Sequence, residues 1–229
     1  MTVAAAIERW IDPGPEDPAF GELLLAQLAR TTRFRDEETA AHMQRMSESC
    51  AAIARRLSFS EPHCERLRAA AQVHDVGKLG IPDAVLRKPG PLTTEERRVM
   101  QRHTEYGHEI LSGSGNELVE LAATIALTHH ERADGTGYPR GLRDDEIPLP
   151  GRIAAVADVF DALTSDRVYR PAFTSEQAVG IMLAGRGTQF DRTVLDAFLD
   201  VRAEIVEIGR RLPDEPAARS SRVVLSPSA

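Results

Sequence analysis

The chain has 229 residues, of which 42% are apolar and 28% charged, as in ordinary soluble globular proteins. Its 35 acidic and 28 basic residues give a formal net charge of -7, which argues against a broad basic face that binds a nucleic acid polymer. No apolar run approaches the length of a membrane-spanning helix and no signal-peptide pattern is present, so we expect no membrane span and a cytoplasmic location.

Helical periodicity runs through most of the chain. Apolar residues recur at three- and four-residue steps over 19–32 and 36–57, with Asp36 as the N-cap of the second segment. Further helices are expected over 61–74, from Thr93 or Thr94 to about 112, and over 116–130, 151–165, 174–185 and 191–210. No alternating pattern long enough for a strand is present, so the sequence predicts an all-α fold, a compact helical bundle.

Two long loops and a polar tail interrupt the helical pattern. Prolines and glycines punctuate 77–92, and 131–150 contains three of each. A loop as long as the second one is usually functional when it lies inside a compact domain. The residues from Pro213 onward are rich in Pro, Ser and Arg and are expected to be disordered. We therefore divide the chain into a helical extension over 1–32, a main domain over 33–212 and a tail over 213–229.

The N-terminal extension is too short to form a second globular domain. It carries a stripe of leucines, namely Leu23, Leu24, Leu25 and Leu28. Such a stripe can pack against the main domain or can form the contact of a homodimer. The sequence leaves both roles open.

Histidine is the unusual feature of this sequence. Of the seven histidines, five are placed where metal ligands would be useful, and two aspartates accompany them. These residues are His42, His74, Asp75, His103, His129, His130 and Asp158. A structural zinc site would normally use closely spaced cysteines, whereas this set contains none and extends from residue 42 to residue 158. The pattern indicates a site assembled between the helices of a bundle.

Taken singly, most of these residues have ordinary explanations. His42 could be a surface or core histidine, and the pair at 129–130 could simply favour the negative end of a helix. Asp158 is harder to dismiss, because it lies in an apolar run and a buried carboxylate needs a cation. Asp161, one turn later, is interpreted as an ion-pair partner or as a support for the ligands. His63 and His108 are interpreted as surface residues.

Four stretches of the chain resemble the HD-GYP family, a subgroup of the HD metal-dependent phosphohydrolases. They are HDVGKLGIPDAVLRKPGPLT (74–93), HHERADGTGYPRGL (129–142), IPLPGRIAAVADVFDALTSDRVYRPA (147–172) and GTQFD (187–191). The resemblance covers residues 33–200 approximately. It implies an all-helical HD-type fold, a bacterial source and hydrolysis of the second messenger cyclic di-GMP to linear pGpG, to GMP, or to both.

The resemblance also implies a ligand set for two or three divalent metal ions, with iron or manganese favoured. Transferred residue by residue, this set is Glu38, His42, His74, Asp75, His103, His129, His130 and Asp158. We assign His42, His74, Asp75 and Asp158 to one ion and Asp75, His103, His129 and His130 to the other, so that Asp75 bridges them. Glu38 lies four residues before His42, on the same helical face, and would serve a third ion.

Catalysis is assigned to His74 and Asp75 together with Lys78, whose charge suits a phosphate or leaving oxygen. The substrate-binding residues are expected to be Lys78, Tyr138, Arg167, Tyr169 and Arg170. Tyr138 belongs to the signature tripeptide at 137–139, and its alternative role is a hydrophobic plug that orders the loop. The resemblance further implies that this loop contacts diguanylate cyclase-type domains.

Two other functions compete with cyclic di-GMP hydrolysis. The chain could be an HD-type phosphohydrolase that acts on another nucleotide, cyclic or not, or a non-catalytic signalling module that binds partner proteins. The intact tripeptide argues against a monoester substrate. The complete ligand set and the tyrosine argue against a module that has lost its activity.

Overall fold

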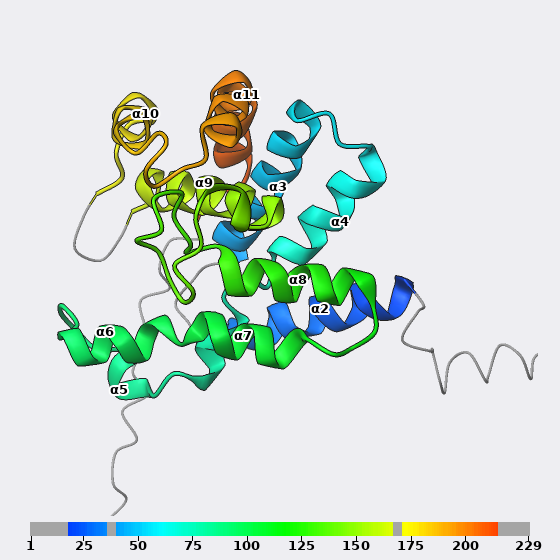
Figure 1. Cartoon of the computed structure of the whole chain (residues 1–229), viewed down its shortest axis with the longest axis vertical. Coiled ribbons are helices and arrows are strands. Elements are labelled where there is room, and N and C mark those ends of the chain that lie inside the picture. Colours follow the sequence, from blue (N-terminus) through cyan, green and yellow to red (C-terminus); the bar gives the residue numbers. More distant parts are fainter. Residues whose placement is uncertain (1–17, 36–39, 167–170, 215–229) are drawn as a thin grey trace, which may run out of the picture.

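The computed structural model describes residues 18–35, 40–166 and 171–214. In Figure 1 this part of the chain is a bundle of helices joined by short connections and one long loop between α8 and α9. The α-helices are α2 (Pro18–Thr32), α3 (Ala40–Arg56), α4 (Glu61–Ala71), α5 (Asp83–Leu86), α6 (Thr94–Gln101), α7 (His103–Leu111), α8 (Glu117–Thr128), α9 (Leu149–Thr164), α10 (Ser175–Ala184) and α11 (Arg192–Arg211). Two short 3-10 helices, η1 (Val76–Gly80) and η2 (Asp144–Glu146), lie in the connections. No strand occurs in these ranges, which confirms the all-α prediction.

Local hydrogen bonds explain where several helices begin. Thr93 and Glu96 form a reciprocal capping box at the start of α6, as the sequence predicts, with Glu96 N–H donating to Thr93 Oγ1 at 3.2 Å. The Asn116 side chain accepts from two main-chain N–H groups at the start of α8, and the Asp191 carboxylate accepts from Val194 N–H at 2.8 Å in α11. These caps satisfy N–H groups that have no partner inside the helix.

The core forms around α3, which packs against α4, α9 and α11. Most α3 residues are buried, and its alanines allow close approach of the neighbouring helices. Met46, Ile53 and Phe198 are among the largest fully buried side chains. Replacing one such side chain by alanine typically lowers the free energy of unfolding by about 2–5 kcal/mol. This rigid framework carries His42 on α3 and Asp158 on α9.

The N-terminal leucine stripe contributes to the core through part of its length. Leu25 of α2 is buried, and Leu24 and Leu28 pack against the same core. Leu23 faces away from this core, and 61% of its surface is exposed. Helix α2 lies against α8 and η1. The intramolecular role of the stripe is therefore real, and Leu23 is the stripe leucine that remains for a contact with another molecule.

Two connections differ from the sequence expectation. The helix expected from Thr93 or Thr94 to about 112 is broken at Arg102 into α6 and α7, because the His103 ring nitrogen Nδ1 bonds the Met100 carbonyl at 2.7 Å. The stretch 77–92 is not wholly irregular, since η1 extends into it and α5 lies within it. Among the described helices, none is both long and apolar enough to cross a membrane.

Candidate metal centre

The seven candidate ligands that the structure describes converge between the helices of the bundle. His42 comes from α3, His74 and Asp75 from the turn between α4 and η1, His103 from the first position of α7, His129 and His130 from the end of α8, and Asp158 from α9. Their ligand atoms form two groups, each with all atoms within 4.8 Å of one another. The four-residue cluster is Asp75, His103, His129 and His130, and the three-residue cluster is His42, His74 and Asp158.

A close approach of two main chains brings the first group together. A Cβ atom on Gly77 would lie 1.9 Å from the His103 carbonyl oxygen, so only glycine allows η1 to reach α7 at this point. This contact sets Asp75, two residues before Gly77, against the His103 ring.

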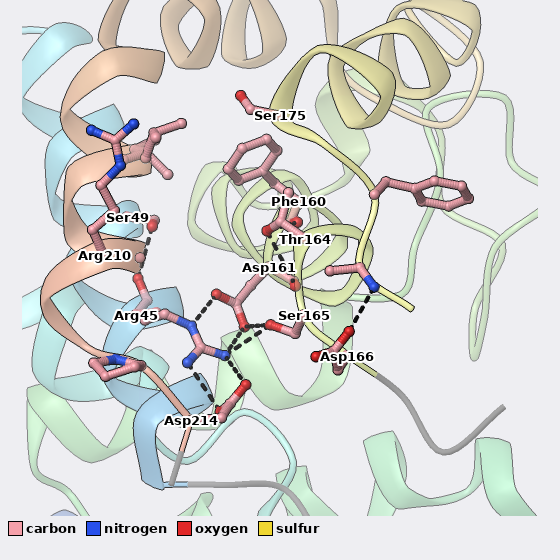
Figure 2. Close-up of a pocket in the computed structure, with 16 residues that line it drawn as sticks. Arg45, Ser49, Phe160, Asp161, Thr164, Ser165, Asp166, Ser175, Arg210 and Asp214 are labelled. Carbon is pink, nitrogen blue, oxygen red and sulfur yellow. Dashed lines mark hydrogen bonds and ion pairs between the residues drawn. The ribbon is translucent and has the colours of Figure 1, made fainter. Parts of the chain in front are cut away.

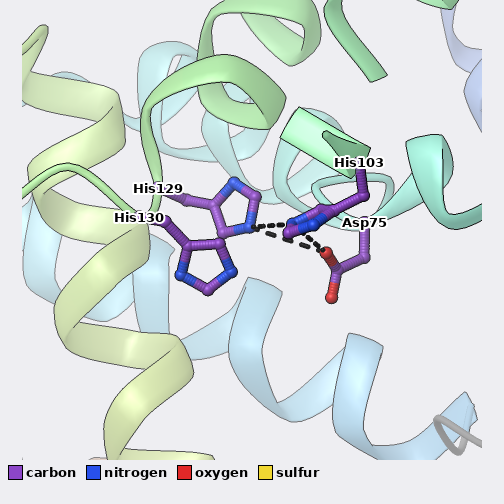
Figure 3. Close-up of side chains that lie close together, drawn as sticks. All are labelled: Asp75, His103, His129 and His130. Atoms are coloured by element: carbon purple, nitrogen blue, oxygen red, sulfur yellow. Dashed lines mark hydrogen bonds and ion pairs between the residues drawn. The ribbon is translucent and has the colours of Figure 1, made fainter. Parts of the chain in front are cut away.

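Figure 3 shows the four-residue cluster, in which the Asp75 carboxylate faces the imidazole rings. Asp75 Oδ1 lies 3.0 Å from His103 Nε2 and 3.6 Å from His129 Nε2, and these two nitrogens are 3.4 Å apart. The His130 ring packs on the His129 ring with centroids 4.1 Å apart. Carboxylate oxygen and imidazole nitrogen are ligands that divalent transition metals accept.

Main-chain carbonyls fix the tautomer of three of the rings. Nδ1 of His103 is 2.7 Å from the Met100 oxygen, Nδ1 of His129 is 3.0 Å from the Ile125 oxygen, and Nδ1 of His74 is 3.1 Å from the Ala71 oxygen. A carbonyl oxygen can only accept, so each Nδ1 carries the hydrogen and each Nε2 of a neutral ring offers a lone pair.

This tautomer gives the cluster the donor set of a candidate cation site. In the neutral tautomer, the contact between His103 Nε2 and Asp75 Oδ1 joins two acceptors, which repel unless a proton or a metal ion lies with them. A divalent ion satisfies the carboxylate and all the nitrogens at once, so the donor set fits a metal.

The electrostatics favour the ligand forms of these groups. Burial lowers the pKa of His129, and it lowers the pKa of His130 well below its usual range, so both rings are neutral near pH 7. Burial alone would raise the pKa of Asp75, but Lys78, His74 and His103 hold it well below its usual value. His129 and His130 are therefore neutral and Asp75 is ionised, which are the forms that metal binding requires of these three residues.

In the three-residue cluster, His42 depends on a carboxylate instead of a carbonyl. Its Nδ1 lies 2.7 Å from Asp161 Oδ2, while its Nε2 lies 3.7 Å from Asp158 Oδ1. The Asp161 carboxylate is held in turn by Arg45, with Nε to Oδ1 at 2.6 Å and Nη2 to Oδ2 at 2.9 Å. The supporting role expected for Asp161 is thus visible. Arg45 was missed, although its position three residues after His42 places it on the same face of α3.

Two residues of the expected substrate set lie beside the clusters. Lys78 Nζ is 2.9 Å from Asp75 Oδ2, one turn along η1. The Tyr138 ring packs on the His130 ring with centroids 4.8 Å apart. Burial raises the pKa of the Tyr138 phenol, so it remains a hydrogen-bond donor at neutral pH.

Glu131 shapes the Tyr138 loop, and no sequence motif pointed to it. Glu131 follows the histidine pair and is only 3% exposed. Its carboxylate accepts hydrogen bonds from Arg140 N–H at 2.7 Å and from Leu142 N–H at 3.0 Å. Within the described ranges no arginine or lysine pairs with Glu131, so main-chain N–H groups satisfy its buried carboxylate, which holds both sides of the loop. Its adjacency to His130 was the available signal.

Four expected site residues lie outside the described residues, namely Glu38, Arg167, Tyr169 and Arg170. The third ion and the arginine contacts to substrate therefore remain predictions from the sequence. The two residues interpreted as surface histidines differ from each other, since His63 is exposed and His108 is half-buried.

Comparison with known proteins gives one family and a set of relatives. The model of the HD domain family matches residues 26–194. The "Cyclic di-GMP phosphodiesterase response regulator RpfG" of Xanthomonas campestris pv. campestris is 48% identical over 80% of this chain and 49% of its own length. The "3'3'-cGAMP-specific phosphodiesterase 2" of Vibrio cholerae is 42% identical over 83% of this chain and 37% of its own. A "Cyclic di-GMP phosphodiesterase" of Thermotoga maritima is 43% identical over 86% of this chain and 54% of its own. The chain thus spans about half or less of these relatives.

Solved structures share the fold at low identity. Bd1817, an HD-GYP-type protein of Bdellovibrio bacteriovorus, superposes with a TM-score of 0.59 at 18% identity, over 86% of this chain and 68% of that one. The HD domain of the phosphodiesterase PgpH of L. monocytogenes, solved with cyclic-di-AMP, gives 0.53 at 19% identity, over 83% and 99%. The described helices are thus those of an HD-type bundle.

Proposed function

The chain belongs to the HD domain family and within it to the HD-GYP group, and from this premise we propose that it is a metal-dependent phosphodiesterase that hydrolyses cyclic di-GMP. The observation that carries the proposal is the pair of ligand clusters that meet at Asp75. Oδ1 of Asp75 faces His103 and His129, and its Oδ2 lies 3.3 Å from His74 Nε2. One carboxylate therefore lies between the nitrogens of both clusters and can serve two ions.

Two divalent ions at such a site supply a nucleophile at neutral pH and neutralise phosphoryl oxygens. Iron and manganese are proposed, because both accept mixed imidazole and carboxylate ligands. Lys78 offers an ammonium group at the Oδ2 side of Asp75, where a phosphate or leaving oxygen would come within its reach. The Tyr138 phenol donates a hydrogen bond to a substrate held over His130. Hydrolysis to linear pGpG, to GMP, or to both is included in the proposal.

The test is turnover by protein purified without oxygen and supplied with iron or manganese. Cyclic di-GMP should be cleaved to a product that chromatography identifies, and Asp75→Asn should not cleave it. Asp83→Asn is the matched control, because Asp83 is an exposed carboxylate near Asp75 in sequence that pairs with Arg35 at 3.1 Å. Absence of turnover in the metal-loaded wild type, with cyclic di-GMP and with its analogues, would refute the function.

The second candidate function is hydrolysis of a related cyclic dinucleotide. Relatives named as 3'3'-cGAMP-specific phosphodiesterases are 42% and 40% identical to this chain, which is close to the identity of those named for cyclic di-GMP. Turnover of equal concentrations of cyclic di-GMP, 3'3'-cGAMP and cyclic-di-AMP ranks the three. A preference for cyclic di-GMP supports the main proposal, and a preference for one of the others replaces its substrate while leaving the metal chemistry intact.

Two contacts with other proteins also remain proposals. The Tyr138 loop is proposed to contact diguanylate cyclase-type domains, because Thr136 and Arg140 are exposed beside the buried Glu131. The outward-facing Leu23 of α2 is proposed for a homodimer contact. Light scattering on the wild type and on Leu23→Asp tests the second proposal, which requires the wild type to have twice the mass of the variant.

A further inference from the structure

The network behind His42 continues beyond Arg45 to the end of α11. Figure 2 shows one guanidinium between two carboxylates, Asp161 on one edge and Asp214 on the other. Arg45 Nη1 donates to the Leu212 carbonyl at 2.9 Å and to Asp214 Oδ1 at 3.0 Å. Nη2 donates to Ser165 Oγ at 2.9 Å. The contact between α3 and the segment after α11 is therefore built from the same side chain that holds Asp161.

This guanidinium is buried, while Asp214 is accessible. The side chain of Arg45 is 6% exposed and that of Asp214 is 35% exposed. A pocket of about 430 Å³ lies beside the network and is lined by Arg45, Asp161, Ser165 and Asp214 among other residues. On that side Arg45 donates hydrogen bonds to Ser165 and Asp214. Asp214 is therefore one of the groups that fix the position of the guanidinium.

The charges of Arg45, Asp161 and Asp214, like their hydrogen bonds, support His42 as a metal ligand. Among the described residues, one guanidinium is shared by two carboxylates behind His42, so its positive charge is divided between Asp161 and Asp214. This division keeps Asp161 a strong acceptor for the His42 Nδ1–H, and a strong acceptor at one ring nitrogen raises the basicity of the other. Without the Asp214 charge, the guanidinium would neutralise Asp161 more completely and His42 Nε2 would be a weaker ligand.

We propose that Asp214 is a positioning residue for the metal ligand His42 and that it acts through Arg45 and Asp161. The proposal rests on the metal-dependent function given above. It assigns the segment after α11 a part in the affinity of the three-residue cluster, while the four-residue cluster has no contact with this network among the described residues.

The chain provides a matched control. Asp200 on α11 pairs with Arg56 on α3 at 2.6 Å, and both side chains are about half exposed. Both ion pairs join α3 to α11 or to the segment that follows it, but the pair of Asp200 and Arg56 has no link to His42. A role that is only structural would lower stability, more at the buried pair than at the exposed one, but would not weaken one ion selectively.

The experiment counts metal ions and measures their affinities by native mass spectrometry and chelator competition, which report on folded molecules. Wild type is compared with Asp214→Asn, Asp214→Glu and Asp200→Asn. We expect Asp214→Asn to weaken one ion by about three- to ten-fold, less than the effect typical of a direct support of a ligand. The other ion should stay as in wild type, and the metal-free protein should stay folded with a lower melting temperature, because the buried Arg45 loses part of its counter-charge. Asp200→Asn should leave both ions unchanged, and Asp214→Glu, which keeps the charge, should restore most of the affinity.

Three results would overturn the inference. Equal effects of Asp214→Asn and Asp200→Asn would make the contact a simple clamp between helices. Unchanged affinity of both ions in Asp214→Asn would remove Asp214 from the network. Equal weakening of both ions would show a general effect on the fold. A wild type that binds no metal would instead refute the proposed function and this inference with it, so the two failures can be told apart.

Discussion

The two ligand clusters differ in what holds their imidazole rings. In the four-residue cluster, His103 and His129 donate through Nδ1 to carbonyls of the main chain just before them. In the three-residue cluster, His42 donates to the carboxylate of Asp161, which belongs to a charged network that runs to Asp214. The first arrangement, which His74 of the three-residue cluster shares through the Ala71 carbonyl, is set by helix geometry. The arrangement at His42 is set by side chains from three parts of the chain.

This difference teaches which cluster can be adjusted. A main-chain carbonyl is neutral and no substitution removes it, so the orientation of His103 and His129 follows from the fold. A carboxylate carries charge, and its strength as an acceptor depends on its other partners. His42 in the three-residue cluster can therefore be tuned by side chains that are not ligands, whereas the carbonyl supports of His103 and His129 cannot be removed by a side-chain substitution.

The largest expected effect comes from Asp75, the residue between both clusters. Asp75→Asn replaces the shared carboxylate by a neutral amide that cannot serve two ions. Charge stabilisation by metals is worth several kcal/mol, so hydrolysis should fall by at least about a thousand-fold. Metal analysis should show that both ions are lost or weakened together. Loss of a single ion would mean that the clusters are independent.

Asp161→Asn is expected to weaken metal binding at the three-residue cluster and to leave the four-residue cluster unchanged. Losing the support of a metal-bound histidine typically lowers metal affinity by about 10- to 100-fold, and this loss should be confined to one ion. The variant also leaves the buried Arg45 with less counter-charge, so unfolding in urea should show a loss approaching about 3–5 kcal/mol. Equal weakening of both ions would contradict the comparison.

A smaller effect, on substrate rather than on metal, is expected from Glu131→Gln. The amide can accept only one of the two main-chain hydrogen bonds that shape the Tyr138 loop. Losing one bond to a charged group is worth about 1.5–3 kcal/mol, so KM should rise by about ten-fold or more while both ions stay bound. Glu146→Gln is the control, because the exposed Glu146 caps the same loop through Arg143 N–H. If Glu131→Gln lost metal, the Glu131 carboxylate would instead contribute to the metal centre.

The smallest effect is a pH dependence of the metal-free protein. Burial lowers the pKa of His129 and His130 from 6.5, so the folded state keeps them neutral while the unfolded chain binds protons. The stability they contribute is complete above about pH 6.5 and is lost as the pH falls towards their folded pKa values, by about 1 kcal/mol per histidine over the first unit. Urea unfolding at about pH 7 and 5.5 measures this loss. His130→Gln should reduce it and His63→Gln should not.

The sequence predicted the parts of this protein that local chemistry decides. The start of α6 follows from the capping residues at 93–96, and the motifs named residues that the structure brings together in the two candidate clusters. The break at Arg102 was not predictable from periodicity, because it depends on a ring nitrogen of His103 that competes for a main-chain carbonyl.

The supporting residues were harder to find, for a physical reason. From the sequence, Arg45 is indistinguishable from a solvated arginine on a helix. Only the fold shows that α9 and the segment after α11 bring carboxylates to both edges of its guanidinium. Glu131 reads as a loop carboxylate until the loop folds back on it. In both cases the partner lies far away in sequence or depends on the loop conformation, so neither propensity nor spacing carries the information.

The contact at Gly77 has a consequence for how the molecule moves. Because η1 and α7 touch through main-chain atoms, with a further close contact from Gly107 to Ala126 of α8, no side chain lies between them to absorb a displacement. Asp75, Lys78 and His103 therefore separate from the bundle together or not at all. We therefore expect local opening of this region to be cooperative, with Asp75 and His103 moving together and leaving His129 and His130 as a pair.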